Sequence, residues 1–116
     1  MKMDKNKGKG AEDLACSYLK DKGYEIIERN YRESVGEIDI ICLKDDYIVF
    51  VEVKARFDDS FGAPSDYVTS SKIRKIRMTT DIYLQKHFEY EDLQVRFDVI
   101  EIYLNDCTIN HYEDAF

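Results

Sequence analysis

Two charged side chains, Glu52 and Lys54, lie inside the most apolar run of the chain, which extends from Tyr47 to Ala55. Because side chains of a strand alternate between its two faces, Glu52 and Lys54 point to the same side. Charges beside a sheet interior cost free energy unless they are paired or bind a metal. Opposite charges at the end of a buried strand therefore favour a functional interpretation.

A third charged residue, Asp39, lies on the preceding predicted strand, and hairpin pairing would place it on the strand next to Glu52. Two carboxylates from adjacent strands can share a hard divalent cation such as Mg²⁺, which prefers oxygen ligands. The cation would polarise a phosphodiester and supply or orient a hydroxide. Lys54 could then steady the charge that develops on phosphorus. Glu12, on a predicted helix, is a further candidate ligand, directly or through water.

The same residues also have a purely structural interpretation. Glu52 and Lys54 can form an ion pair on a sheet face, and Glu12 can interact favourably with the N-terminus of its helix. An acid-x-Lys tripeptide is expected roughly twice by chance in a chain of this composition. Its weight here comes from its position on the most apolar strand, and from the residues alone we give the two interpretations equal weight.

The elements that must position these residues are predicted from apolar periodicity and turn residues. The pattern predicts a helix at about residues 11–19 that ends at Gly23, strands at 24–31, 37–43 and 47–55, a loop at 57–67, a helix capped by Thr69 or Ser70, a strand at 93–104 and a short edge strand at 107–112. We expect one domain over residues 1–116, with residues 1–8 flexible, built as a mixed α/β sheet flanked by helices.

Charge and composition restrict the possible partners. A net charge of −7 argues against a general nucleic-acid binder. Residues 1–10 and 66–86 nevertheless each carry an excess of three positive charges, so a local basic surface is possible, although ordinary solvated faces explain each run equally well. Three distant cysteines and the lack of a long apolar stretch predict a cytoplasmic protein with reduced thiols and no membrane partner.

Short motifs extend from residue 8 to about residue 104. They are Gly8-x-x-Ala11-Glu12-Asp13-x-Ala15, Gly23-Tyr24, Asn30-Tyr31-Arg32, Gly36-Glu37-Ile38-Asp39-Ile40-Ile41, Val49-Phe50-Val51-Glu52-Val53-Lys54-x-Arg56, Phe61-Gly62-x-Pro64, Val68-x-x-x-Lys72, Tyr83-Leu84 and Arg96-Phe97-Asp98-Val99-Ile100. With this order of helices and strands, they resemble the PD-(D/E)xK nuclease superfamily. More narrowly, the chain resembles the bacterial YraN-like family, which is related to archaeal-type Holliday junction resolvases.

This resemblance implies a restriction-endonuclease-like fold with an α-β-β-β-α-β core. It implies Asp39 and Glu52 as ligands of Mg²⁺ (or Mn²⁺), Lys54 as the catalytic lysine and Glu12 as the acid of the first helix. The activity it implies is a metal-dependent DNA endonuclease that acts on branched or otherwise structured DNA, and resolvase-like relatives suggest a homodimer.

Two positions depart from the family pattern, Ala11 in place of Gly and Ile38 in place of Pro, and neither removes a functional group. Arg56 can contact a phosphate or be a surface arginine, and Lys72 can face the site or lie on a solvated helix face. The alternatives to a nuclease are a non-catalytic nucleic-acid-binding or protein-docking module with the same fold, and a purely structural interaction protein.

Overall fold

The computed structural model of the chain describes residues 2–57 and 69–116, with side chains from residue 10 onward. Its elements are α1 (Lys2–Asp21), β1 (Glu25–Glu33), β2 (Gly36–Lys44), β3 (Tyr47–Arg56), α2 (Ser70–Lys86), the short 3₁₀ helix η3 (Phe88–Tyr90), β4 (Gln94–Tyr103) and β5 (Thr108–Tyr112). The predicted loop at 57–67, with its Phe61–Pro64 motif, lies almost wholly outside the described residues, and so does Val68.

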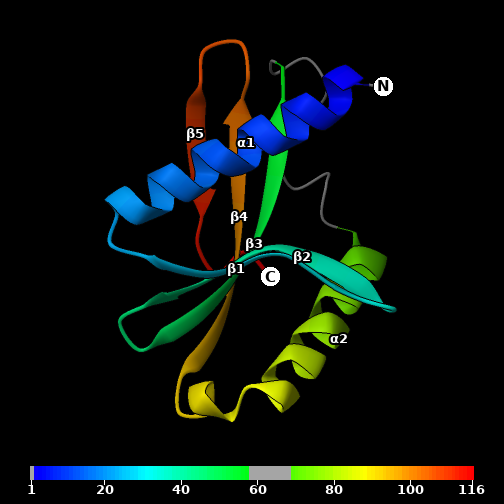
Figure 1. Cartoon of the computed structure of the whole chain (residues 1–116), viewed down its shortest axis with the longest axis vertical. Coiled ribbons are helices and arrows are strands. Elements are labelled where there is room, and N and C mark those ends of the chain that lie inside the picture. The colour runs from blue at the N-terminus through cyan, green and yellow to red at the C-terminus, as the bar shows by residue number, and fades with distance from the viewer. Residues whose placement is uncertain (1, 58–68) are drawn as a thin grey trace.

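The five strands form one sheet in the order β1-β2-β3-β4-β5, with β3 at its centre (Figure 1). β3 and β4 are parallel, whereas the other neighbouring strands are antiparallel. The parallel pair requires a crossover connection, and α2 lies within it. A mixed five-stranded sheet flanked by two helices is an α/β fold consistent with a restriction-endonuclease-like core, which confirms the predicted fold class.

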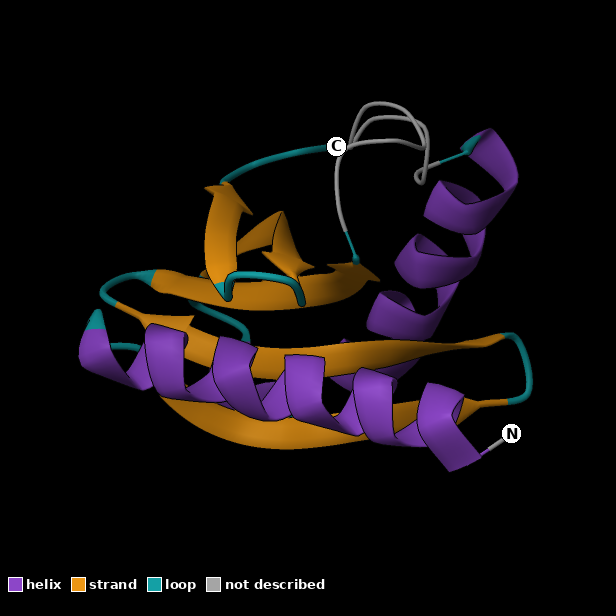
Figure 2. Cartoon of the chain, turned by 90° about the horizontal axis from the view of Figure 1, so that it is seen from above, coloured by secondary structure: helices purple, strands orange, loops and turns teal. Residues whose placement is uncertain are grey.

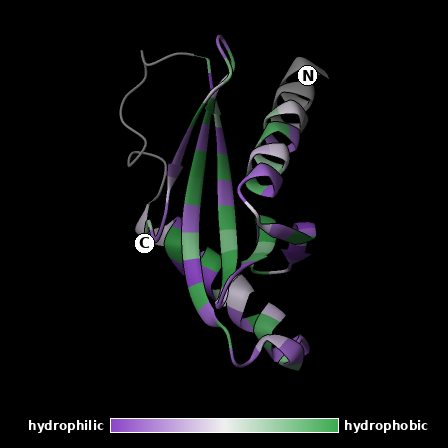
Figure 3. Cartoon of the chain, turned by 90° about the vertical axis from the view of Figure 1, so that its left-hand side faces the viewer, coloured by the Kyte–Doolittle hydropathy of each residue, from purple (hydrophilic) through white to green (hydrophobic). Residues whose placement is uncertain are grey.

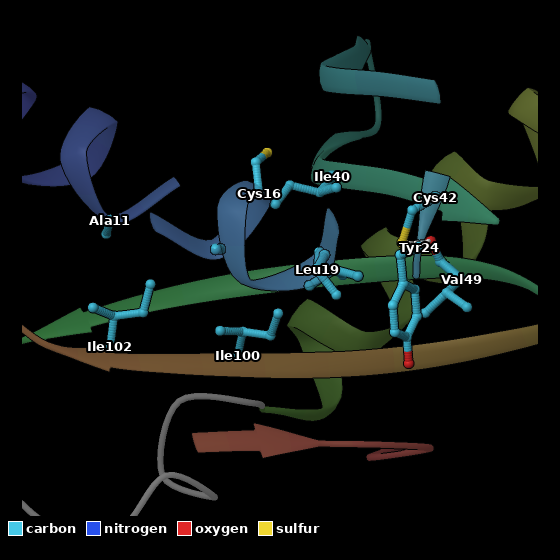
Figure 4. Packing of buried hydrophobic residues seen from close by; sticks show 11 residues of the cluster. Ala11, Cys16, Leu19, Tyr24, Ile40, Cys42, Val49, Ile100 and Ile102 are labelled. Carbon is cyan, nitrogen blue, oxygen red and sulfur yellow. Dashed lines mark hydrogen bonds between the residues drawn. The ribbon is translucent and has the colours of Figure 1, made fainter. Parts of the chain in front are cut away.

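Alternate residues of β3 divide the core between the two faces of the sheet. Val49 and Val51 belong to the cluster that packs against α1, whereas Ile48 and Phe50 belong to the cluster that packs against α2. The helices therefore cover opposite faces (Figure 2), and hydrophobic and hydrophilic positions alternate along the strands (Figure 3). Figure 4 shows the α1 side of the core, where the helix lies directly over the side chains of the sheet.

Most element boundaries follow the predicted signals. Gly23 ends α1 with φ of 90°, in the left-handed region that glycine adopts without cost. Thr69 caps α2, because its hydroxyl accepts a hydrogen bond from the Lys72 N–H at 3.2 Å. α1 begins at Lys2, so it includes residues 2–8, which the sequence predicts to be flexible. In the described part of the chain, no helix is long and apolar enough to cross a membrane.

A buried polar network joins β4 and β5 to α1. The Arg96 guanidinium donates to both carboxylate oxygens of Asp98, at 2.8 and 2.9 Å. His111 Nε2 lies 2.6 Å from the same carboxylate, and its Nδ1 lies 3.0 Å from the Tyr18 hydroxyl. Burial disfavours the Asp98 carboxylate, but hydrogen bonds from His111 and Arg96 outweigh burial and hold its pKa below the usual range.

Candidate active site

The site begins where β2 and β3 separate. Their pairing ends at Ile40 and Val51, although β2 begins at Gly36 and β3 continues to Arg56. Beyond this point β2 pairs only with β1, and β3 pairs only with β4. The strands therefore form a fork, and Figure 1 shows β2 running sideways while β3 turns upward.

Asp39 is the residue of β2 that directly precedes the segment paired with β3. Its Oδ2 accepts a hydrogen bond from the backbone N–H of Val53 at 2.8 Å. A side-chain carboxylate thus accepts the hydrogen bond that a backbone carbonyl of β2 would accept in a continuous sheet. Burial raises the pKa of Asp39 to about 6; the Val53 hydrogen bond lowers this pKa, and the negative charges of Glu12 and Glu37 raise it further.

Glu52 is the first residue of β3 inside the fork, and it shares the α2 side of the sheet with Asp39. Its side chain is nearly buried, at 6% exposure, and its Oε2 has no hydrogen-bond partner among the described residues. Burial, followed by the charge of Asp39, raises the pKa of Glu52 to about 8, and Lys72 and Lys54 oppose this rise. Two neighbouring carboxyl groups are thus held in an environment that disfavours their ionisation.

The fit to a divalent cation follows from that environment. A cation between Asp39 and Glu52 would neutralise two carboxylates that repel each other and would give the orphaned Oε2 of Glu52 a partner. Mg²⁺ commonly binds through one or two carboxylates and keeps several waters, so two protein ligands suffice. No group of three or more potential ligands among His, Cys, Asp and Glu occurs in the described residues.

Lys54 lies beside these carboxylates on the same face of β3. Its side chain is half-buried and lies close to Lys72 of α2, which lines the same cleft. Burial lowers the pKa of Lys54, the neighbouring Lys72 lowers it further, and the charges of Glu52 and Asp39 oppose this change. Lys72 therefore faces the site and does not lie on a solvated helix face.

A cleft of about 540 Å³ contains this group. One wall comes from the two arms of the fork and the other from the N-terminal half of α2. Its lining residues are Gly36, Glu37, Asp39, Glu52, Val53, Lys54, Thr69, Ser71, Lys72, Lys75 and Ile76. The arrangement places three carboxyl groups and three amines around one opening, which suits a bound metal together with a phosphate.

The structure places Glu12 outside the lining of this cleft. Glu12 lies on α1, and its Oε1 is 3.6 Å from Nη2 of Arg29. Its charge still raises the pKa of Asp39. In this structure Glu12 therefore acts on the site through its electric field and makes no contact within the cleft.

The structure also corrects the expectation for Arg56. Its side chain is buried, and its Nη1 lies 3.2 Å from Oε2 of the fully buried Glu101. Arg56 does not line the cleft, so neither the phosphate contact nor the surface arginine describes this position. Glu101, on β4, also accepts hydrogen bonds from Asn110 and Tyr112 of β5. The Arg56–Glu101 ion pair therefore connects the end of β3 to the edge strand β5.

Sequence reasoning missed Ser71 and Lys75, which both line the cleft. Their signal was available, because positions 71, 72 and 75 fall on one side of a helix. Glu37 also lines the cleft, and its Oε2 lies 3.2 Å from Nε of Arg32.

Comparisons with known proteins found one similar solved structure and several similar sequences. A solved structure of Pyrococcus furiosus SfsA in complex with Ca²⁺ is 16% identical, with a TM-score of 0.37, over 95% of this chain and 63% of that one. The UPF0102 protein of Alkaliphilus oremlandii (strain OhILAs) is 47% identical over 98% of this chain and 100% of its own length. A UPF0102 protein of Clostridioides difficile (strain 630) is 44% identical over 97% and 98% of the two chains.

The model of the Uncharacterised protein family UPF0102 matches residues 11–102, which include both arms of the fork and all of α2. The chain belongs to the UPF0102 family.

Proposed function

We propose that the chain is a metal-dependent nuclease that hydrolyses phosphodiester bonds in DNA. The observation that carries this proposal is the pair of Asp39 and Glu52 at the mouth of the fork, with one buried oxygen of Glu52 lacking a partner among the described residues. Lys54 and Lys72 complete a charged cleft that is open to solvent.

Asp39 and Glu52 would hold Mg²⁺ or Mn²⁺ through Oδ and Oε atoms. When bound, the cation would polarise the phosphodiester and provide an activated water. Asp39 is held in place by the Val53 N–H, and Glu52 by its position on the central strand. These residues therefore need little rearrangement to bind.

Lys54 would act on the phosphate itself. Its Nζ lies on the same strand face as Glu52, two residues further along β3. From there it can donate a hydrogen bond to a non-bridging phosphate oxygen, where negative charge increases in the transition state. Lys72 lines the same cleft and would add a second positive charge at the phosphate.

The substrate class rests on the resemblance to resolvase-like nucleases, which favours branched or otherwise structured DNA. The test is incubation of labelled linear, nicked and four-way DNA with Mg²⁺, with Mn²⁺ and with a chelator. We expect metal-dependent cleavage that Asp39→Asn abolishes. Asp45→Asn is the matched control, since Asp45 lies in the β2–β3 turn at the other end of the hairpin. Equal products from the wild type and Asp39→Asn on every substrate would refute catalysis at this site.

A second candidate is a non-catalytic nucleic-acid-binding module. The placement of Glu12 outside the cleft favours it, because the described residues then hold no group of three acids that could bind a metal there. This candidate predicts DNA binding that persists in the presence of a chelator and in Glu52→Gln, with no product in any of the cleavage assays.

A further inference from the structure

Lys75 is a basic residue of α2 that forms no ion pair with an acid of the described residues. Many basic side chains are held by acids: Arg29 by Asp13, Arg32 by Glu37, Arg56 by Glu101, Lys86 by Glu33 and Arg96 by Asp98. Lys75 is exposed and lines the cleft, and no acid among the described residues forms an ion pair with it. Lys75 thus places a positive charge at the opening of a cleft that also contains carboxylates.

The backbone of Lys75 is fixed relative to the carboxylates. A Cβ added to Gly36 would lie 2.9 Å from Thr79 Oγ1 and 3.4 Å from both Cβ and O of Lys75, so α2 packs directly on the first residue of β2. The Thr79 hydroxyl donates to the carbonyl oxygen of Lys75 at 2.8 Å. Asp39 follows Gly36 by three residues on the same strand.

Lys72 and Lys75 lie three residues apart on α2, so their side chains are neighbours on one side of the helix. Lys72 lies close to Lys54 beside the carboxylates, whereas Lys75 lies about 4.5 Å further along the axis of α2. The helix therefore presents two positive charges in succession along the cleft, and flexible lysine side chains let them reach neighbouring phosphates of one strand.

We propose that Lys75 binds the phosphate next to the one at Asp39 and Glu52, so that the substrate strand runs along α2 from Lys72 toward Lys75. This inference rests on the proposed function, since it assumes a nucleic acid in the cleft. Lys75 is then a substrate-positioning residue, and Arg74 is not, because Arg74 is exposed on the same helix and does not line the cleft.

The first test measures binding without cleavage. Fluorescently labelled four-way and duplex DNA are titrated with Asp39→Asn protein in chelator at several salt concentrations, with and without Lys75→Gln or Arg74→Gln. Loss of one phosphate contact makes the negative slope of log K against log salt shallower by about 1. We expect this reduction, with severalfold weaker binding, for Lys75→Gln, recovery in Lys75→Arg and no change for Arg74→Gln.

The second test uses the active protein. Lys75→Gln should raise KM with kcat nearly unchanged, because the contact is equally present in the ground and transition states. If Lys75→Gln and Arg74→Gln give the same salt slope while Asp39→Asn binds DNA, the role of Lys75 is wrong and the proposed nuclease stands. If neither the wild type nor Asp39→Asn binds any of the DNAs, both proposals are wrong.

Discussion

The backbone N–H of Val53 donates to Oδ2 of Asp39 at 2.8 Å, across the point where β2 and β3 stop pairing. This single contact connects the two arms of the fork and orients one of the two acids. The neighbour of Val53 on the same strand is Glu52, the second acid. The spacing of the carboxyl groups is thus set by the backbone of a central strand and does not depend on long side chains.

Replacing Asp39 separates its structural from its chemical role. Asp39→Asn keeps an oxygen that can accept the Val53 N–H, whereas Asp39→Ala leaves that donor without its acceptor. We expect the alanine variant to be less stable than the asparagine variant by about 1–3 kcal/mol, and both to lose cleavage. Urea unfolding measures the difference, and equal stabilities would show that the contact contributes little.

The raised pKa values of Asp39 (about 6) and Glu52 (about 8) predict how stability depends on pH without metal. The folded protein binds these protons more tightly than the unfolded chain does. The resulting stabilisation is therefore complete below about pH 4 and is lost as the pH rises to 8. The side chain at position 52 does not titrate in Glu52→Gln. The unfolding free energy of this variant minus that of the wild type should therefore increase by more than about 1 kcal/mol between pH 5 and pH 8. A constant difference across this range would contradict the prediction.

Divalent cations should reverse that loss. Mg²⁺ competes with protons for the carboxylates, so it should raise Tm more at pH 8 than at pH 6. Thermal unfolding with and without Mg²⁺ measures the shift. Glu52→Gln should show no shift and Asp45→Asn the full shift. An equal shift in Glu52→Gln would place the binding site elsewhere.

Glu12 provides a test of how far the metal site extends. Its carboxylate contacts Arg29 and influences Asp39 only by raising its pKa. We therefore expect Glu12→Gln to retain most of the Mg²⁺-dependent rise in Tm, and to change stability by less than about 1 kcal/mol, since Arg29 keeps its partner Asp13. Complete loss of the Mg²⁺ effect would instead make Glu12 a metal ligand.

Gly36 is required by close packing and not by backbone strain. A methyl group there would meet Thr79 Oγ1 at 2.9 Å, so Gly36→Ala should destabilise the protein by more than about 1 kcal/mol. Removing the obstructing hydroxyl in Gly36→Ala/Thr79→Ala should recover part of the loss. Denaturant unfolding of the four proteins completes the double-mutant cycle, and strict additivity would mean that the two side chains do not meet.

Local patterns were sufficient for most of the fold. The apolar run from Tyr47 to Ala55 and the turn residues before it predicted the β2–β3 hairpin, and with it the proximity of Asp39 to Glu52. They did not predict the fork, because pairing that stops early leaves no mark on the alternation of either strand.

The remaining errors concern partners that are distant in the sequence. Arg56 is buried and forms an ion pair with Glu101, which lies 45 residues away in the sequence. No local sequence signal identifies such a partner. The place of Glu12 depends on how α1 lies over the sheet, and helical periodicity predicts the buried side of a helix but not its angle on that sheet.

β3 forms hydrogen bonds with neighbouring strands along most of its length and packs on both faces. Glu52 is therefore held by the stiffest part of the molecule, whereas Lys72 is carried by a helix that contacts the sheet on one side only. Lys54 shares the support of Glu52, because it lies two residues from Glu52 on β3. The backbone of α2 at Lys75 packs closely against Gly36, so adjustment of the cleft to an incoming strand falls to the long side chains of the α2 lysines, while the carboxylates stay in place.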